Sequence, residues 1–319
     1  MTETTKEVLD KYQVRKTQKQ KQAFRDYLKN ICESNNYEYK EEKGYCGSKN
    51  VIVGDVDKAK VIYTAHYDTQ TVLPIPYIHI PKKPLLTIFL QIIMYLVLIF
   101  AVSVGTALLK IVLNSVGLTG TVVNIILRVI LILTTIMLFA MSYVGIINKH
   151  TANDNTSGVT TLIDIMTSLH VDNRANVAFI FFDLEEMGLL GSAGFAKKHK
   201  EIKLNTLVVN FDCVANGNKI LFVVSKGAKG YLKVLRNSFT SSEYFEVEFA
   251  LKGVYYPSDQ AAFRCGVGVA ALNKRNKFEY LSNSHSPKDT VYDEKNIEFL
   301  VDGAKKLIEE ISNINWHLK

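Results

Sequence analysis

The chain has 319 residues, of which 48% are hydrophobic and 22% charged, and its formal net charge is +7. The mean hydropathy of +0.07 fits neither an ordinary soluble enzyme nor a transporter with many spans. The lysines are spread along the chain and interleaved with acidic residues, without a dense basic stripe or a nucleic-acid-reading motif. The composition therefore argues against nucleic acid as a partner and suits a basic protein at an anionic lipid surface.

The cysteines and the first residues both point to a reducing compartment. Four cysteines are present, without C-x-x-C spacing or a disulfide framework, so we expect free thiols: Cys32, Cys46, Cys213 and Cys265. The opening MTETTKEVLDKYQ is polar and lacks the apolar centre of a secretory signal. We therefore predict a cytoplasmic catalytic part.

The first quarter of the chain predicts one helix, two strands and a connector. Residues 17–33 have apolar positions at helical spacing. Residues 49–55 (KNVIVGD) and 58–68 (KAKVIYTAHYD) read as two strands, in a hairpin or side by side. Residues 73–84 (LPIPYIHIPKKP) contain four of the six prolines, so we expect a stiff connector and neither a central strand nor a helix interior.

Two uncharged apolar runs follow, at residues 85–109 and 129–147. Each is close to the roughly 20 residues that span a bilayer, and neither has the polar stripe of a core helix. The alternatives are a hairpin of buried core helices or an apolar lid that dimerises. We predict a transmembrane helical hairpin inserted at 84–148.

An inserted hairpin returns the chain to the side on which it began. The catalytic domain is then divided into residues 1–83 and 149–319, and both parts lie in one compartment. Lys82, Lys83 and Lys149 flank the hairpin on the domain side, which favours a cytoplasmic domain. Lys110 and Arg128 lie nearer the tip, where long side chains reach the interface.

Beyond residue 148, strand and helix patterns alternate. Such alternation predicts a three-layer α/β fold with a mixed, largely parallel sheet covered by helices on both faces. Ligands of these sheets gather at the carboxyl ends of the strands. The predicted elements are a helix at 158–170, a strand at 176–183, a helix at 187–199, a strand at 206–212 and a helix at 295–313.

Candidate site residues fall at those strand ends and in the loops. His66 and Asp68 are two apart at the end of a strand, so they share a face, and an aspartate can orient a metal-bound imidazole through its second nitrogen. Asp154, in NDNTSG, precedes a helix, and Gly158 permits a tight approach there. Asp154 is otherwise interpreted as the N-cap of that helix.

The segment FIFFDLEEMGLLGS places Glu185 and Glu186 directly after an apolar strand. One carboxylate could bind a metal while the other moves a proton, and the alternative is an acidic helix start favoured by the helix dipole. Asp212 ends the strand TLVVNFD. His285, in SNSHSPKDT, would read as a surface histidine if it stood alone.

Taken together, these residues suffice for a two-metal site. Two divalent ions can be held if Asp154 bridges them. Imidazole and carboxylate ligands without a thiolate favour zinc, with cobalt and manganese as alternatives. The candidate ligands are His66, Asp154, Glu186, Asp212 and His285.

The sequence resembles the co-catalytic di-zinc aminopeptidase family, which also includes glutamate carboxypeptidase, transferrin receptor and glutaminyl cyclase. The motifs AHYDT, NDNTSGV, DLEEMGLLGS, VNFD, PSDQAAFRCGV and HSPKDT occur in the family's order, from about Val61 to Val291. The resemblance implies a zinc-exopeptidase fold and a role for each motif residue. His66 and His285 would bind one zinc, Glu186 and Asp212 the other, with Asp154 bridging, Glu185 as general base and Asp68 supporting His66.

Three features depart from the family pattern. Gln260 stands where the family usually has histidine, and Ser284 where a tyrosine often precedes the last zinc-binding histidine. Tyr255 or Tyr256 could donate a hydrogen bond to the oxyanion instead. The family also joins the first His-x-Asp to the bridging aspartate by a short loop, whereas this chain inserts the connector and the two apolar runs.

The expected function is that of a membrane-anchored, zinc-dependent exopeptidase, and an aminopeptidase in particular. The hairpin would hold the cleft near the bilayer, which makes apolar or membrane-derived peptides natural substrates; in a weaker version it is only a tether. Carboxypeptidase activity, glutaminyl cyclase activity and a non-catalytic membrane scaffold are the alternatives. The cyclase is disfavoured because relatives with that chemistry use one zinc. The oligomeric state stays open.

Overall fold

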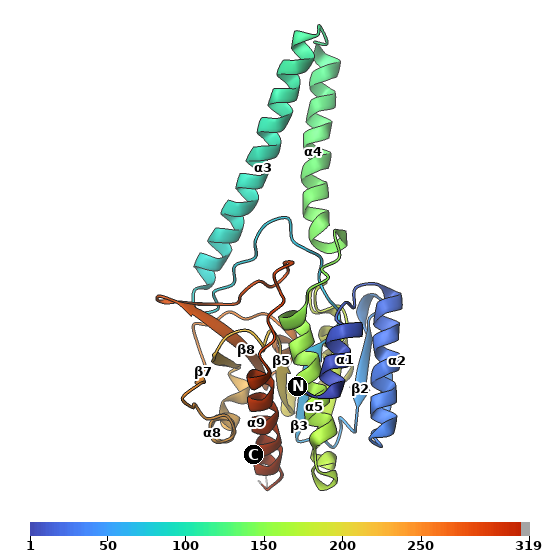
Figure 1. Ribbon diagram of the computed structural model, residues 1–319, viewed down its shortest axis with the longest axis vertical. Helices are drawn as coiled ribbons and strands as arrows, with labels where there is room; N and C mark the ends of the chain where they lie inside the picture. The colour runs from blue at the N-terminus through green and yellow to red at the C-terminus, as the bar shows by residue number, and fades with distance from the viewer. Residues whose placement is uncertain (314–319) are drawn as a thin grey trace.

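The computed structural model describes residues 1–313 and contains one mixed sheet with helices on both faces (Figure 1). The strand order is β1-β2-β4-β3-β5-β8-β6-β7, with β9 paired to β8. The strands are β1 (Tyr39–Lys43), β2 (Lys49–Val53), β3 (Val61–His66), β4 (Val177–Phe182), β5 (Leu207–Phe211), β6 (Lys219–Val224), β7 (Glu246–Ala250), β8 (Gly266–Arg275) and β9 (Phe278–Tyr280).

The described residues also form nine α-helices. They are α1 (Glu3–Lys11), α2 (Gln18–Ser34), α3 (Pro84–Ser115), α4 (Thr121–Val144), α5 (Gly158–Ser168), α6 (Leu190–Lys198), α7 (Lys200–Asn205), α8 (Leu232–Ser238) and α9 (Glu294–Ser312). The predicted helix at 17–33 is confirmed as α2. It begins with a capping box, in which Thr17 accepts from the Gln20 N–H and the Gln20 side chain accepts from the Thr17 N–H.

Burial of alternate strand residues divides the core into two layers. In β3, Val61, Tyr63 and Ala65 face a large core shared with α1, α2, α5, α8 and α9. Ile62 faces a smaller core on the opposite side, which includes residues of α6 and α7. Because both faces are covered, every residue of β3 and β4 is buried. The predicted three-layer α/β fold is confirmed, and its continuous parallel part is β4-β3-β5-β8.

The predicted pairing of the two strands at 49–55 and 58–68 is wrong. β2 and β3 do not pair with each other, because β4 lies between them, antiparallel to β2 and parallel to β3. The residues between them turn at Gly54 (φ +82°), and the Asp55 carboxylate accepts the N–H groups of Asp57 and Lys58. This link crosses the roughly 10 Å between strands two positions apart and leaves room for a later strand.

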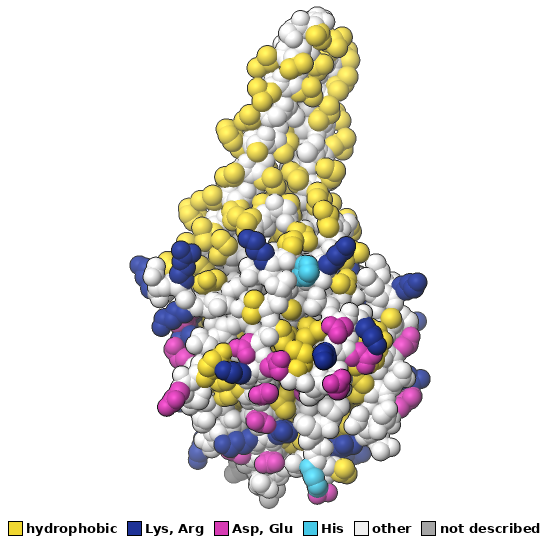
Figure 2. All heavy atoms as spheres, viewed as in Figure 1, with side chains coloured by type: hydrophobic (Ala, Val, Ile, Leu, Met, Phe, Trp, Pro, Cys, Tyr) yellow, Lys and Arg dark blue, Asp and Glu magenta, His cyan; other side chains and the backbone are white. Residues whose placement is uncertain are grey.

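Helices α3 and α4 form a hairpin that projects away from the sheet (Figure 1). At 1.5 Å per residue they are about 48 and 36 Å long, which exceeds the roughly 30 Å of a bilayer core. Only Thr87 in α3 and Leu127 and Ser142 in α4 are buried. In Figure 2 apolar side chains cover this projection, whereas charged side chains cover the domain below it. Two helices are thus long and apolar enough to cross a membrane.

The hairpin leaves the domain where two chain segments meet. Thr71 and Ile147 form an antiparallel bridge, and the Val72 N–H donates to the Ile146 carbonyl at 2.7 Å. Residues 73–83, named the connector below, contain neither helix nor strand, as the prolines predicted. The connector leads directly into α3.

Candidate metal centre

The candidate ligands meet at one edge of the sheet. His66 is the last residue of β3, and Asp212 directly follows β5. Glu186 lies in the turn after β4, and since these three strands are parallel, their carboxyl ends coincide. Asp154 comes from the kinked turn Ala152–Ser157 before α5, and His285 from the loop after β9.

Asp154 lies between the two histidines. Its Oδ1 is 3.6 Å from His66 Nε2, and its Oδ2 is 3.1 Å from His285 Nε2. His66 Nε2 is also 3.6 Å from Asp212 Oδ1, whereas His285 Nε2 is 3.6 Å from Glu186 Oε2. These contacts favour a division in which each histidine shares an ion with a different carboxylate. The resemblance implied that both histidines bind one ion, and these contacts do not favour that division.

The arrangement fits divalent cations better than direct hydrogen bonds. Three of the four separations are 3.6 Å, too long for hydrogen bonds, and one is 3.1 Å. All four lie near the roughly 3.3 Å that separates ligands placed about 2.0–2.1 Å from a tetrahedral zinc ion. Buried carboxylate oxygens without a hydrogen-bond partner among the described residues include Glu186 Oε1 and Asp212 Oδ1. The nitrogen and oxygen donors suit zinc, although the buried thiol of Cys213 also lies beside Asp154 and Asp212.

Electrostatics supports the same interpretation. Burial raises the pKa of Glu186 to about 8, and repulsion from Asp154 adds to this effect. Burial opposes the charge on His285, but the carboxylates of Glu186 and Asp154 outweigh it and raise the pKa of His285 to about 9. Without cations, Glu186 therefore tends to hold a proton, and His285 tends to be protonated beside the neighbouring carboxylates.

Asp68 organises the site through both its main chain and its side chain. His66 Nδ1 is 3.0 Å from the Asp68 carbonyl, which can only accept, so Nδ1 carries the proton and Nε2 is free for a metal. The Asp68 carboxylate accepts the N–H groups of Glu185 and Glu186 at 3.0 and 3.2 Å. The His66 imidazole is thus held by the Asp68 carbonyl, with the Asp68 carboxylate also near, at 3.7 Å from Nδ1. The same carboxylate fixes the two glutamates.

The two glutamates lie in a turn and not at the start of a helix. Left-handed backbone at Leu184 and Leu189, with φ of +57° and +61°, shapes this turn. Helix α6 begins only at Leu190, later than the predicted position 187. The interpretation of Glu185 and Glu186 as an acidic first helical turn is therefore wrong. Burial, with repulsion from neighbouring carboxylates, raises the pKa of Glu185 well above its usual range.

The loop that carries Asp154 is held by its neighbours. The Asp289 carboxylate accepts the N–H groups of Asn153 and Asp154 at 3.0 and 2.9 Å. A Cβ atom at Gly158 would lie 2.2 Å from the Phe211 carbonyl, so only glycine permits this approach of α5 to β5. The Asp154 carboxylate contacts the histidines, and no capping bond from it to α5 is present. The N-cap alternative is therefore not what the structure shows.

The positions that depart from the family pattern serve buried contacts. Gln260 accepts from Asn210 at 3.1 Å and donates to the Tyr256 carbonyl at 2.7 Å. The Tyr256 hydroxyl donates to the Asp212 carbonyl at 2.8 Å, so it supports a candidate ligand. Asp259, next to Gln260, is fully buried and was not singled out from the sequence. Burial raises the pKa of Asp259 to about 7. Its negative charge in turn helps to raise the pKa of Glu185.

The connector also contributes to the site, which the sequence did not indicate. A pocket of about 110 Å³, named the metal pocket here, is lined by the five candidate ligands together with Glu185, Tyr77, His79, Cys213, Tyr256, Pro257, Leu281 and Ser284. His79 Nε2 donates to the Tyr255 carbonyl at 2.9 Å, so its Nδ1 accepts from the Tyr77 hydroxyl, also at 2.9 Å. Tyr77 lies outside the family motifs, and no spacing rule could have identified it.

A sheet covered by helices on both faces, with candidate metal ligands at the carboxyl ends of its strands, is the arrangement expected of an α/β metallopeptidase. The chain belongs to peptidase family M28, whose family model matches residues 140–300. It is therefore a metallopeptidase by family, with peptides as the family's substrates. No curated protein sequence matches the chain.

Solved structures share the fold at low sequence identity. A Zn-dependent exopeptidase from Parabacteroides distasonis aligns with a TM-score of 0.59 and 16% identity, covering 98% of this chain and 97% of its own. The LapA aminopeptidase of Legionella pneumophila aligns at 0.57 and 14%, over 98% and 68%. A glutaminyl cyclase from Porphyromonas gingivalis aligns at 0.54 and 14%, over 96% and 95%. The predicted zinc-exopeptidase fold is thus confirmed.

Proposed function

We propose that the protein is a membrane-anchored aminopeptidase that uses two zinc ions. Asp154 would bridge the ions, with His66 and Asp212 completing one ligand set and Glu186 and His285 the other. The observation that carries this proposal is the position of Asp154, which presents one carboxylate oxygen to each histidine. A carboxylate that binds a single ion does not require its two oxygens to face two different histidines.

The chain's own residues supply the proton transfer. When bound, two divalent cations would lower the pKa of a water molecule and polarise the scissile carbonyl. Glu185 is held by its N–H to Asp68 and is not needed as a ligand. Its carboxylate would take the proton from the attacking water and deliver it to the leaving amine. Cations nearby would keep this carboxylate ionised by opposing the burial and repulsion that raise its pKa.

Charge in the metal pocket favours an amino terminus over a carboxyl terminus. Four carboxylates line this pocket, those of Asp154, Glu185, Glu186 and Asp212. No Lys or Arg is among the pocket's lining residues in the described chain. Two bound divalent cations would balance these four charges, so the preference rests on the side chains themselves. An α-ammonium group can pair with a carboxylate there, whereas an α-carboxylate would meet no cationic side chain. This observation favours aminopeptidase over carboxypeptidase activity.

The exposed apolar hairpin supports membrane anchoring. Large apolar side chains on α3 and α4 are open to the surroundings, with exposed fractions of 69% for Phe100 and 78% for Val144. Exposure of this extent is compatible with lipid around the helices and unfavourable in water. Both catalytic segments would then lie on one side of the membrane, near its surface.

The test uses full-length protein and three matched peptides, with free, N-blocked and C-blocked ends. We expect release of the first residue from the free and C-blocked peptides, loss of activity with chelator and recovery with zinc. Glu185→Gln should keep its zinc and lose roughly 10²–10⁴-fold in rate, because it removes the proton acceptor only.

Other outcomes identify the alternatives. Cleavage of the N-blocked peptide would indicate a carboxypeptidase. Cyclisation of a peptide with N-terminal glutamine, without hydrolysis of the others, would indicate a glutaminyl cyclase, an activity named for one of the structures that share the fold. Bound zinc without any reaction would support the scaffold.

A further inference from the structure

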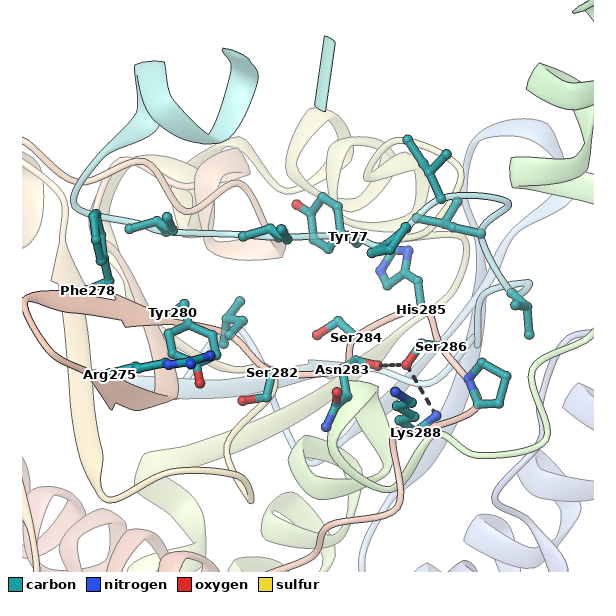
Figure 3. Close-up of a pocket in the computed structure, with 18 of the residues that line it drawn as sticks. Tyr77, Arg275, Phe278, Tyr280, Ser282, Asn283, Ser284, His285, Ser286 and Lys288 are labelled. Atoms are coloured by element: carbon teal, nitrogen blue, oxygen red, sulfur yellow. Dashed lines mark hydrogen bonds between the residues drawn. The ribbon is translucent and has the colours of Figure 1, made fainter. Parts of the chain in front are cut away.

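A second and larger cavity adjoins the metal pocket, and the connector covers it. This side cavity has a volume of about 910 Å³, within the roughly 300–1,000 Å³ typical of ligand sites. Residues 72–78 and 80 form one wall, and residues 275, 276, 278 and 280–288 form the other. Figure 3 shows the connector along one side and the segment from Arg275 to Lys288 along the other.

The side cavity borders the metal pocket and shares part of its lining. Tyr77, Leu281, Ser284 and His285 line both spaces. The metal pocket, at about 110 Å³, has room for little beyond metal ions and the reacting groups. Any larger part of a substrate must therefore lie outside it, and the side cavity is the adjoining space large enough for several residues.

Hydrogen bonds hold the covering wall at both ends, so that the cavity is preformed. The Leu73 N–H donates to the His285 carbonyl at 3.1 Å. At the other end, the Leu281 N–H donates to the His79 carbonyl at 3.0 Å, and Lys82 pairs with Glu279 at 2.9 Å. The segment 74–78 spans the distance between these attachments.

The lining of the side cavity is mainly apolar, and in the described part of the chain it includes cations but no carboxylates. Its apolar members include Ile75, Ile78 and Phe278, and serine and asparagine side chains line part of the wall at 276–286. Among the described lining residues, the cationic side chains besides His285 are those of Arg275 and Lys288. In Figure 3 Arg275 lies at the end of the cavity away from His285. The metal pocket offers carboxylates and no Lys or Arg in the described chain, whereas the mainly apolar side cavity has a basic rim. This difference matches a peptide with its amino end at the metals and its carboxyl end in the cavity.

We propose that the side cavity binds the apolar residues that follow the scissile bond of a short peptide. This inference rests on the proposed aminopeptidase function and names its substrate class. An aminopeptidase has only one residue before the scissile bond, so a space for several residues serves those after it. The selectivity would depend on the connector, which belongs to the inserted part of the chain, and basic residues at these positions would be disfavoured by Arg275 and Lys288.

The experiment compares two substrates in full-length protein reconstituted in lipid nanodiscs. One is the tetrapeptide Leu-Val-Ile-Phe and the other is leucine p-nitroanilide, which has no residues after the scissile bond. Ile78→Asp places a charge in the cavity, and Ile78→Ala serves as a milder variant. Val171→Asp is the matched control, because Val171 is exposed before β4, away from the carboxyl ends of the strands.

For Ile78→Asp we expect the ratio of kcat/KM for the tetrapeptide to kcat/KM for the anilide to fall by about tenfold or more, with a smaller fall for Ile78→Ala. Val171→Asp should leave the ratio unchanged. Equal losses on both substrates, or no loss in either Ile78 variant, would overturn the proposal.

Binding separates this proposal from the proposed function. Fluorescence anisotropy of a labelled Leu-Val-Ile-Phe peptide, measured on Glu185→Gln protein with and without Ile78→Asp, reports the cavity without turnover. Weaker binding with Ile78→Asp, in a protein whose wild type hydrolyses nothing, would retain the cavity and reject the aminopeptidase. Hydrolysis by wild type together with unchanged peptide binding in Ile78→Asp would support the aminopeptidase function and contradict the peptide-binding role of the side cavity. Displacement of the labelled peptide by added lipid alone would indicate that an acyl chain occupies the side cavity instead.

Discussion

The ring of Tyr77 stacks on the imidazole of His285, with the ring centroids 5.1 Å apart and the planes inclined by 25°. His285 Nε2 faces Asp154 and Glu186, and Nδ1 has no hydrogen-bond partner among the described residues, so the stacking holds the ring from its face while the carboxylates hold its edge. A residue of the inserted connector thus positions a candidate metal ligand 208 residues further along the chain.

Variants of Tyr77 test this relationship. Tyr77→Ala removes the stacking and should weaken zinc binding by about tenfold or more, in the range found when groups that orient a ligand are lost. Tyr77→Phe keeps the ring and loses only the bond to His79, so it should retain zinc affinity. Competition with a chromogenic chelator measures both. Equal loss in both variants would assign the effect to the hydroxyl, and wild-type affinity in Tyr77→Ala would contradict a positioning role.

Asp289 is predicted to stabilise the loop that carries Asp154. Asn at this position can accept only one of the two N–H groups and turns an amide donor toward the other, so Asp289→Asn should cost about 1–3 kcal/mol of unfolding free energy. Denaturant unfolding of the metal-free protein measures this cost. Asp302→Asn, at an exposed site on α9, should stay within about 0.5 kcal/mol of wild type. A similar result for Asp289→Asn would contradict the role of this carboxylate.

Zinc binding should release protons near neutral pH. In the metal-free site the pKa of His285 is about 9 and that of Glu186 about 8, so both groups carry protons at about pH 7, and a metal must displace them. Zinc affinity should therefore fall as the pH is lowered from about 9.5 to 6. Calorimetry in buffers of different ionisation enthalpy counts the protons. Heats independent of the buffer at about pH 7 would contradict the assignment of these two ligands.

The single exposed cysteine reports the side of the membrane on which the domain lies. Of the four free cysteines, Cys46 is exposed and the others are buried. If the domain is cytoplasmic, a membrane-impermeant maleimide should label Cys46 only after the cells are permeabilised, and Cys46→Ser should abolish this labelling. Labelling in intact cells would place the domain on the outer side.

Several parts of the fold followed from local patterns in the sequence. The buried runs at β4 and β5, the amphipathic helices α2 and α9 and the connector lie where the sequence predicted them. The position of β4 between β2 and β3 could not be predicted, because strand order depends on contacts between distant segments. The strands β6 to β9 also went unpredicted, although their register completes the sheet.

The candidate site divides in the same way. Strand ends and short motifs pointed to the residues that converge, from His66 to His285. The division of ligands between two ions, the main-chain role of Asp68 and the participation of Tyr77 depend on distances across the fold. No spacing in the sequence contains that information.

The number of zinc ions tests the central claim most directly. Metal-free protein would be titrated with zinc while peptide hydrolysis and bound metal are followed together, in wild type and in Asp154→Asn. The account predicts two ions for each chain, with full activity only when both are bound, and fewer than two in Asp154→Asn because the bridge is weakened. A wild-type protein that reaches full activity with one zinc ion would contradict it.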